Sequence, residues 1–322
     1  MDWETIDTDL AGIDIEDSTY KITTDQSIEP LVASIGAMGL LNPPFLFVKN
    51  DRQYVVISGF KRVAACQHLK LGRIRARIVN ACIPRKRLAE IAICENVSQR
   101  PLNLVETSRA LILLRRHVKE KREMQRVALN LGLPDNPSIA DKIARICLLP
   151  ASIQEGILQG LILLNVALEL GSLEKNAGIL LAELFTYLHF SHSKQREVIT
   201  SIKEVALREG VTLVSLLQDP QVQSLVSNAE LDRAQKVNKL RNYFRSKRYP
   251  QMTIFENRFQ EQSRRLSLGE NIRLKPPAGF ESRDYLFTLR IKNLSALDSS
   301  IKTLQNVLEN PALKNILSRN QK

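Results

Sequence analysis

A glycine followed by two cations at the start of a helix is a residue pattern that could bind an anion. The apolar run YVVIS at 54–58 predicts a strand, Gly59 ends it, and Lys61 and Arg62 follow where a helix is expected. Backbone N–H groups, the helix dipole and two positive charges all favour a phosphate group there. An ordinary strand–helix turn with two solvated charges has the same sequence, so both interpretations stay open on these residues alone.

A second polar cluster, ENVSQRPLNLVE, occupies residues 95–106. Glu95 and Asn96 are adjacent, and carboxylate and amide oxygens are the hard ligands that Mg²⁺ prefers. The two residues could equally form a solvated helix end. A phosphate site and a magnesium site in one small domain together predict a nucleotide.

Alternating helical and strand patterns must position these two clusters. The expected small α/β unit covers residues 20–98, since periodicity predicts helices and strands in turn. Its expected elements are a helix at 26–40, strands at 42–50 and 51–58, a helix at 60–71, a strand at 73–79 and a helix at 85–97.

The chain is expected to be helical from Asn103 to about residue 245. Asn103 and Glu106 have the spacing of an N-cap and its partner three residues on. The segment 123–150 reads as helix, GLP turn and helix, which is typical of a helix-turn-helix. The candidate DNA-contacting residues on its second helix are Ser138, Lys142 and Arg145.

The C-terminal end predicts two strands and a helix, a ββα unit. Ser295 and Asp298 suggest the cap of that helix, whose apolar residues fall on one side at Leu294, Leu297, Ile301, Leu304 and Leu308. A unit of this size is too small to bury a core alone, so we expect a homodimer.

The charge distribution favours a polyanionic partner. The formal net charge is +12, and residues 233–265 hold ten Lys and Arg against two Glu, whereas residues 1–29 hold nine acids and one base. Lys247 and Arg248 are candidate DNA contacts in this basic run, although a solvated face with bridging acids is the ordinary interpretation of such a run.

Cysteine spacing and hydropathy give expectations about the compartment. The four cysteines form no C-x-x-C pair, which disfavours a zinc knuckle and favours a reducing compartment. The first 17 residues lack the pattern of a signal peptide, and no apolar run reaches the roughly 18 residues of a membrane span. We therefore expect a cytoplasmic protein with no membrane partner.

The order and spacing of these motifs resemble the ParB family of chromosome and plasmid partition proteins. LVASIGAMGLLNPPFLFV is similar to the family's opening segment, GFKRVAA to its G-E-R-R-x-x-A phosphate motif, and ENVSQRPLNLVE to its E-N-x-Q-R-x-x-L-x-x-x-E segment. The resemblance implies an N-terminal domain that binds CTP with Mg²⁺ and closes as a clamp on DNA. It further implies a helix-turn-helix that reads a centromere site, a C-terminal dimerisation domain and a ParA-type ATPase partner.

The resemblance assigns roles to individual residues. Gly59, Lys61 and Arg62 would contact phosphates, Glu95 would serve hydrolysis or metal organisation, and Asn96 would be a ligand of Mg²⁺. The chain departs from the family pattern at Phe60, where the family usually has Glu. Without a gap, the family's Gln and Arg fall on Ser98 and Gln99, and Arg100 lies one place late. These departures predict slow CTP hydrolysis or none.

Two enzyme alternatives fit the residues less well. Sulfiredoxin shares the N-terminal fold but uses a cysteine in a G-C-H-R turn, and here Phe60 stands at that position with Cys66 more than one helical turn later. A nuclease would need several clustered metal-binding acids. The sequence near these motifs offers only one clear candidate, Glu95, so a nuclease is disfavoured.

We therefore expect an α+β, mainly helical protein with three parts. They are a ParB-like nucleotide-binding domain at 1–100, a helical domain with a helix-turn-helix at 101–230, and a basic linker with the ββα dimerisation unit at 231–322. The expected function is a CTP-dependent clamp in plasmid or chromosome partition. The alternative is a noncatalytic DNA-binding transcriptional regulator with a decayed nucleotide site.

Overall fold

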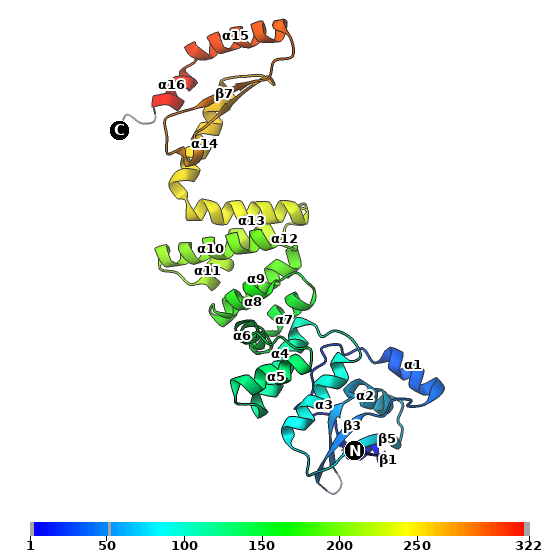
Figure 1. Ribbon diagram of the computed structural model, residues 1–322. Helices are drawn as coiled ribbons and strands as arrows, with labels where there is room; N and C mark the ends of the chain where they lie inside the picture. The colour runs from blue at the N-terminus through cyan, green and yellow to red at the C-terminus, as the bar shows by residue number, and fades with distance from the viewer. Residues whose placement is uncertain (1–2, 51–52, 319–322) are drawn as a thin grey trace. The chain divides into compact units, whose positions relative to one another are not determined.

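The computed structural model describes residues 3–50 and 53–318 and confirms a mainly helical α+β protein with a small mixed sheet. The chain divides into two compact units after Gln195 (Figure 1). The boundary expected at residue 100 therefore lies inside the first unit. The expected division into three functional parts stays a prediction.

A five-stranded sheet forms the N-terminal part of the first unit. Its strands are β1 (Trp3–Asp9), β2 (Ile13–Asp14), β3 (Phe45–Asn50), β4 (Gln53–Ser58) and β5 (Arg73–Val79), in the order β1-β5-β3-β4-β2. The pairs β1/β5 and β3/β4 are antiparallel, whereas β3/β5 and β2/β4 are parallel. The sheet is therefore mixed.

Strand β1 was not expected from the sequence, and it explains the acidic start of the chain. Asp7 lies opposite Arg75 and Asp9 lies opposite Arg73. The Nε–Oδ1 distances are 3.8 Å for the first pair and 3.5 Å for the second. Opposite charges on facing strands favour this pairing, so the acids of the N-terminus match the arginines of β5.

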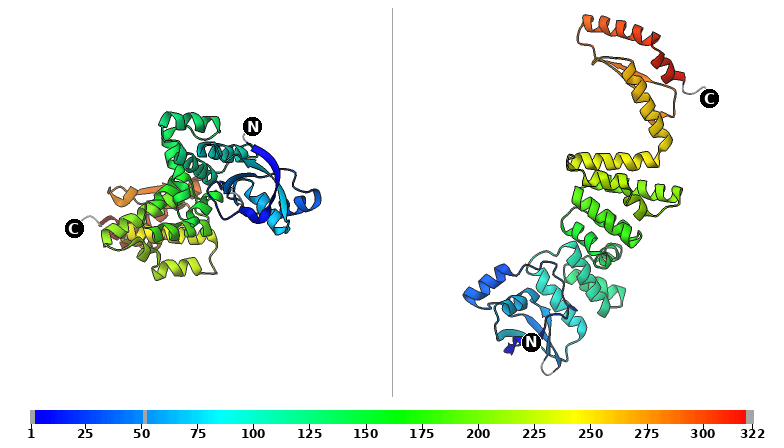
Figure 2. Two further views of the ribbon diagram at one scale, coloured as in Figure 1. Left: turned by 90° about the horizontal axis from the view of Figure 1, so that it is seen from below. Right: turned by 180° about the vertical axis from the view of Figure 1, so that it is seen from behind.

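Three helices pack on this sheet and on one another, α1 (Glu29–Met38), α2 (Phe60–His68) and α3 (Arg85–Val97). Helix α1 packs against α2, and α3 packs against β4. The view in Figure 1 and the two views in Figure 2 all show α1 on the side of the sheet away from α4 and α5. The α1–α2 side of the core includes Leu46, Val56, Val63, Cys66, Ile74 and Ala76. Burial raises the pKa of the Cys66 thiol, which suits a core residue rather than a nucleophile.

Helix α4 (Leu104–His117) begins with the expected cap. The Asn103 side chain accepts a hydrogen bond from the Glu106 N–H, and the Glu106 side chain accepts one from the Asn103 N–H. Helices α5 (Lys121–Asn130) and α6 (Pro137–Ala144) follow with a turn between them that contains Gly132. Helix α6 is shorter than expected, because a 3₁₀ turn at Ile146–Leu148 replaces its last residues. Arg145 therefore lies just beyond the helix.

The rest of the chain is helical up to Arg265. The remaining helices of this stretch are α7 (Ala151–Leu158), α8 (Leu164–Gly171), α9 (Lys175–Leu188), α10 (His192–Glu209), α11 (Leu213–Leu217), α12 (Pro220–Ser227), α13 (Arg233–Arg248) and α14 (Pro250–Arg265).

The C-terminal end has the expected ββα order, with β6 (Ile272–Lys275), β7 (Leu286–Leu289) and α15 (Leu294–Glu309). Helices α14 and α16 (Pro311–Leu317) complete a small core with this unit, built around Leu266, Leu274, Val307, Leu313 and Ile316. The ββα unit thus buries a core together with two further helices of the same chain, and the expected homodimer stays a prediction.

The expected cap of α15 is also wrong. Asn293 is the N-cap, since its side chain accepts a hydrogen bond from the Ala296 N–H. Ser295 is already inside the helix, and Asp298 pairs with Lys302 at 2.8 Å instead of serving the cap.

Candidate nucleotide site

A cavity of about 510 Å³ lies where α2 begins and α3 ends. The chain segment 22–25, which we call the strap, lines one side of it. The cavity brings together the five residues assigned to nucleotide and metal from the sequence, namely Gly59, Lys61, Arg62, Glu95 and Asn96. Residues from separate elements therefore share one site.

Gly59 is the N-cap of α2 and has a φ of 96° and a ψ of 25°. This left-handed conformation strongly favours glycine. A Cβ at this position would lie 2.9 Å from the Pro44 Cβ, so the space beside the turn excludes a larger residue as well. Gly59 has no side chain that could cap the first turn of α2, so the N–H groups of this turn lack an N-cap acceptor at the edge of the cavity. Such N–H groups suit an anion.

The Arg62 guanidinium is held by backbone carbonyls and by Glu95. Its Nη1 donates to the Asn42 oxygen at 2.8 Å and to the Pro43 oxygen at 3.3 Å. Its Nη2 lies 3.8 Å from Oε2 of Glu95. Burial lowers the pKa of Arg62, while the Glu95 carboxylate acts in the opposite direction. An arginine side chain stays protonated near neutral pH even when it is buried, so Arg62 is a permanent positive charge in the cavity.

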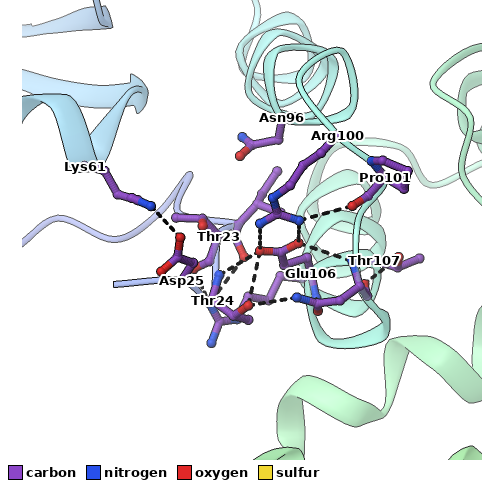
Figure 3. A network of polar contacts seen from close by, with 12 residues as sticks. Thr23, Thr24, Asp25, Lys61, Asn96, Arg100, Pro101, Glu106 and Thr107 are labelled. Carbon is purple, nitrogen blue, oxygen red and sulfur yellow. Dashed lines mark hydrogen bonds and ion pairs between the residues drawn. The ribbon is translucent and has the colours of Figure 1, made fainter. Parts of the chain in front are cut away.

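Lys61 and Asn96 also have partners within the chain. Lys61 Nζ contacts Oδ2 of Asp25 in the strap at 2.5 Å (Figure 3). This contact lowers the pKa of the Asp25 carboxyl. The Asn96 Nδ2 donates to the Ala92 oxygen one turn earlier, at 2.7 Å. That bond leaves the Asn96 carbonyl oxygen as the group that could serve a metal.

Three further charged residues in the cavity carried no site assignment from the sequence: Asp25, Arg77 and Arg100. Arg77 comes from β5, and its guanidinium also lies 4.9 Å from the centre of the Phe45 ring. With Lys61 and Arg62 the lining holds four cations against two carboxylates, Asp25 and Glu95. The cavity is therefore net positive, as a site for a polyphosphate requires.

An ion pair between exposed Arg100 and buried Glu106 joins the cavity to α4 (Figure 3). Arg100 Nη1 and Nη2 each donate to Glu106 at 2.7 Å, and the Glu106 side chain is fully buried. Glu106 also accepts from the Thr24 N–H at 2.9 Å and from the Asn103 N–H at 3.2 Å. Burial alone would raise the pKa of Glu106, but these hydrogen bonds outweigh burial and lower it to about 2.

The strap is attached to α4 by a second arginine. Arg109 Nη1 donates to the Thr23 oxygen at 2.8 Å and to the Ile22 oxygen at 3.3 Å. The strap therefore lines the cavity through Ile22, Thr23 and Asp25 and is hydrogen-bonded to α4 through Ile22, Thr23 and Thr24. The order and spacing of Arg100 and Glu106 in the sequence suggested a motif, but their mutual ion pair was not expected.

The donor set fits a magnesium ion that is held mainly by phosphates. Glu95 and Asn96 offer one carboxylate and one amide oxygen, and Mg²⁺ in nucleotide sites usually takes one or two protein ligands together with phosphate oxygens and waters. Within the part of the chain that the structure describes, no group of three or more His, Cys, Asp or Glu side chains could hold a metal ion. The chain therefore offers no preformed metal cage in that part.

The three DNA candidates around α6 all lie on the surface. Ser138, Lys142 and Arg145 are exposed; Ser138 and Lys142 are four residues apart on one face of α6, and Arg145 follows directly after its end. Among residues 3–50 and 53–318, no side chain pairs with Lys142 or Arg145, and α6 itself is held to α4 by an Arg115–Asp141 contact of 2.5 Å.

The two candidates in the basic run are engaged within the second unit. Arg248 makes two hydrogen bonds to Glu204, at 2.5 Å and 2.6 Å, and Lys247 lies 3.7 Å from Asp219. These acids lie outside residues 233–265, so the scarcity of acids in the run did not predict unpaired charges. Arg248 therefore has a structural role in addition to any contact with DNA.

Comparison with known proteins identifies the N-terminal part of the chain. Residues 10–97 match the model of the ParB N-terminal domain. This segment of the chain is therefore similar to the N-terminal domain of ParB proteins. The ParB domain holds Gly59, Lys61, Arg62, Glu95 and Asn96, so these five lining residues of the cavity lie within the matched segment.

Three curated proteins are similar to part of this chain. A probable chromosome-partitioning protein ParB of Treponema pallidum is 31% identical over 132 residues, which are 41% of this chain and 39% of the relative. One of Helicobacter pylori is 27% identical over 139 residues, 43% of this chain and 46% of the relative. A nucleoid occlusion protein of Lysinibacillus sphaericus is 28% identical over 138 residues, 43% of this chain and 44% of the relative. The matches span less than half the length of these relatives.

Solved structures show a weaker likeness. A C-terminally truncated ParB of Caulobacter crescentus complexed with CTP-γ-S is 21% identical over 57% of this chain and 99% of its own, with a TM-score of 0.27. This TM-score is too low for a conclusion about a shared arrangement. Across the described residues of this chain, no helix combines the length and the apolar character needed to cross a bilayer.

Proposed function

We propose that this chain is a partition protein that binds CTP with Mg²⁺ in the cavity between α2 and α3 and acts as a clamp on DNA. The observation that carries the proposal is the net positive cavity at the uncapped N-terminus of α2, within a ParB N-terminal domain. Lys61, Arg62 and Arg77 beside the N-terminus of α2 match a triphosphate better than they match a neutral ligand.

In this proposal the phosphates replace contacts that the chain makes with itself. Lys61 leaves Asp25, and Arg62 turns its Nη2 from Glu95 to a phosphate oxygen. Glu95 and Asn96 would hold the metal through their side-chain oxygens. A bound Mg²⁺ would neutralise charge on the phosphate oxygens. Phe60 is buried and provides no carboxylate, which supports slow CTP hydrolysis or none.

The same proposal gives the helical part a role in DNA binding. The exposed Ser138, Lys142 and Arg145 would contact DNA, and Lys247 with Arg248 would add nonspecific contacts only by loosening their ion pairs. A ParA-type ATPase is the proposed protein partner, because the curated relatives named ParB are chromosome-partitioning proteins.

A homodimer through α15 completes the proposal. Three residues seven apart along this helix are exposed apolar side chains, Leu294 at 84%, Ile301 at 46% and Leu308 at 69%. Half-buried Leu297 and Leu304 lie between them. Apolar residues at spacings of three and four form a seam that a second copy of the helix could cover.

The second candidate function is a DNA-binding transcriptional regulator with a decayed nucleotide site. The intramolecular partners of Lys61 and Arg62 favour it, because a site that never binds nucleotide would still need to neutralise its cations. In this alternative the α6 face reads DNA without any nucleotide.

Isothermal titration calorimetry distinguishes the clamp from the regulator. The full chain is titrated with CTP, UTP, ATP and GTP in the presence of Mg²⁺, with and without DNA. The clamp proposal expects CTP to bind and the other three to bind weakly. Asn96→Ala should weaken CTP binding with Mg²⁺ present and leave it unchanged in EDTA. Binding of none of the four nucleotides would favour the regulator.

A further inference from the structure

A second cavity lies on the other side of the strap, against α4. Its volume is about 380 Å³, and Ile22 and Thr23 line both this cavity and the nucleotide cavity. Three cations line it, Lys21, Arg109 and Arg116, and no carboxylate is among its described lining residues. The nucleotide cavity, in contrast, holds two acids.

The two arginines face the cavity from the same side of α4. Arg109 and Arg116 are seven residues apart, which places them two turns along one face of the helix. Both hydrogen bonds of the Arg109 side chain leave from Nη1, so Nε and Nη2 remain for another partner. Arg116 is exposed, and among the described residues it has no hydrogen bond or ion pair. Charges of one sign that converge without an acid favour a bound anion.

The other lining residues suit a phosphate group. Ser18 and Gln26 add hydroxyl and amide donors, and the lining also holds the apolar residues Ile112, Leu113 and Leu148. The lining segment Cys147–Leu148 is attached to α4, because the Cys147 N–H donates to Ser108 Oγ at 2.9 Å. We propose that this second cavity is a phosphate-binding site separate from the nucleotide cavity, with Arg109 and Arg116 as its main ligands.

The phosphate could come from the DNA backbone or from a free phosphate compound. Arg115, next to Arg116, pairs with Asp141 of α6, so the site adjoins the helix that carries the DNA candidates. A backbone phosphate beside α6 would reach Arg116, which is exposed. A small phosphate compound would fit the cavity itself.

Titration with pyrophosphate tests the site itself. The full chain with Arg62→Gln serves as the background, because this change weakens the nucleotide cavity. Adding Arg116→Gln should weaken pyrophosphate binding about tenfold, the usual loss for a charge-assisted hydrogen bond. Adding Lys175→Gln, which removes an exposed charge that lines neither cavity, should leave it unchanged.

A salt series with a nonspecific DNA duplex identifies the source of the phosphate. If it is the DNA backbone, Arg116→Gln in the otherwise unchanged protein should reduce the slope of log K against log salt by about 0.9, and Lys175→Gln should not. If it is a free phosphate compound, pyrophosphate binding falls and the slope stays the same. Equal pyrophosphate binding and equal slopes in the Arg116 and Lys175 variants would overturn the proposal.

Discussion

Replacing Glu106 with glutamine should destabilise the first unit by about 3 kcal/mol at pH 7. The fully buried carboxylate accepts hydrogen bonds from Arg100, Thr24 and Asn103, and its pKa is about 2 instead of the ordinary 4.5. Each pKa step of one corresponds to about 1.4 kcal/mol, so the gap corresponds to about 3 kcal/mol of unfolding free energy. Glu106→Gln removes the charge on which this contribution depends.

The stability difference between wild type and Glu106→Gln should depend on pH in one direction. A carboxyl whose pKa is lower in the folded state contributes stability above pH 4.5, and the contribution fades as the pH falls from 4.5 towards 2. The difference between wild type and variant should therefore be full at pH 7 and smaller at pH 3. Urea unfolding followed by the fluorescence of Trp3, the single tryptophan, measures the unit that contains Glu106.

The matched control is Glu183→Gln on α9 in the same unit. Glu183 is exposed, and its carboxylate has no hydrogen bond or ion pair among the described residues. Its replacement should change the unfolding free energy by less than about 0.5 kcal/mol. The reasoning is refuted if Glu106→Gln behaves like this control, or if its effect is the same at pH 3 as at pH 7.

Three further changes have defined outcomes. Asp25→Asn should raise CTP affinity a few fold, because it frees Lys61 for phosphate; calorimetry that finds no gain would contradict the exchange of partners. Gly59→Ala should lower the unfolding free energy by about 1–3 kcal/mol and weaken CTP binding, since its φ is 96° and its Cβ would meet Pro44; an unchanged melting temperature would contradict this. Ile301→Asp should dissociate the dimer by placing an unpaired charge in the seam, and sedimentation of a monomeric wild type at micromolar concentration would rule the seam out.

Local patterns predicted the helices around the site well. Helix α3 has the predicted bounds, and the Asn103 cap with Glu106 is present as expected. Gly59 ends a strand and starts a helix as expected, whereas its left-handed conformation was not predicted. Such features depend on residues a few positions apart, so the sequence contains them directly.

Features that depend on distant pairs were missed. Strand β1 pairs with β5 some 70 residues later, and Asp25 reaches Lys61 across 36 residues. Arg77 joins the cavity because β5 lies beside β3, whose place in the sheet the periodicity did not predict. The alternating arginines of β5 and the acids of the N-terminus were visible in the sequence, and their complementary charge was the available signal for β1.

For the basic run 233–265, local composition was misleading. It suggested unpaired positive charges, but Lys247 and Arg248 have acidic partners. Within the second unit, Arg248 pairs with Glu204 of α10, and Lys247 pairs with Asp219, the N-cap of α12. A count of charges within 233–265 could not reveal these acids, because helix packing supplies them from other segments.

Titration of wild type, Arg62→Lys and Arg62→Ala with CTP and Mg²⁺ tests the central claim most directly. Arg62 also holds the Asn42 and Pro43 carbonyls, so thermal unfolding must first show that each variant is folded. We predict that wild type binds CTP, that Arg62→Ala binds it about tenfold or more weakly, a loss of about 1.5–3 kcal/mol, and that Arg62→Lys falls between them. Equal affinity of all three folded proteins, or no binding by wild type, would contradict the account.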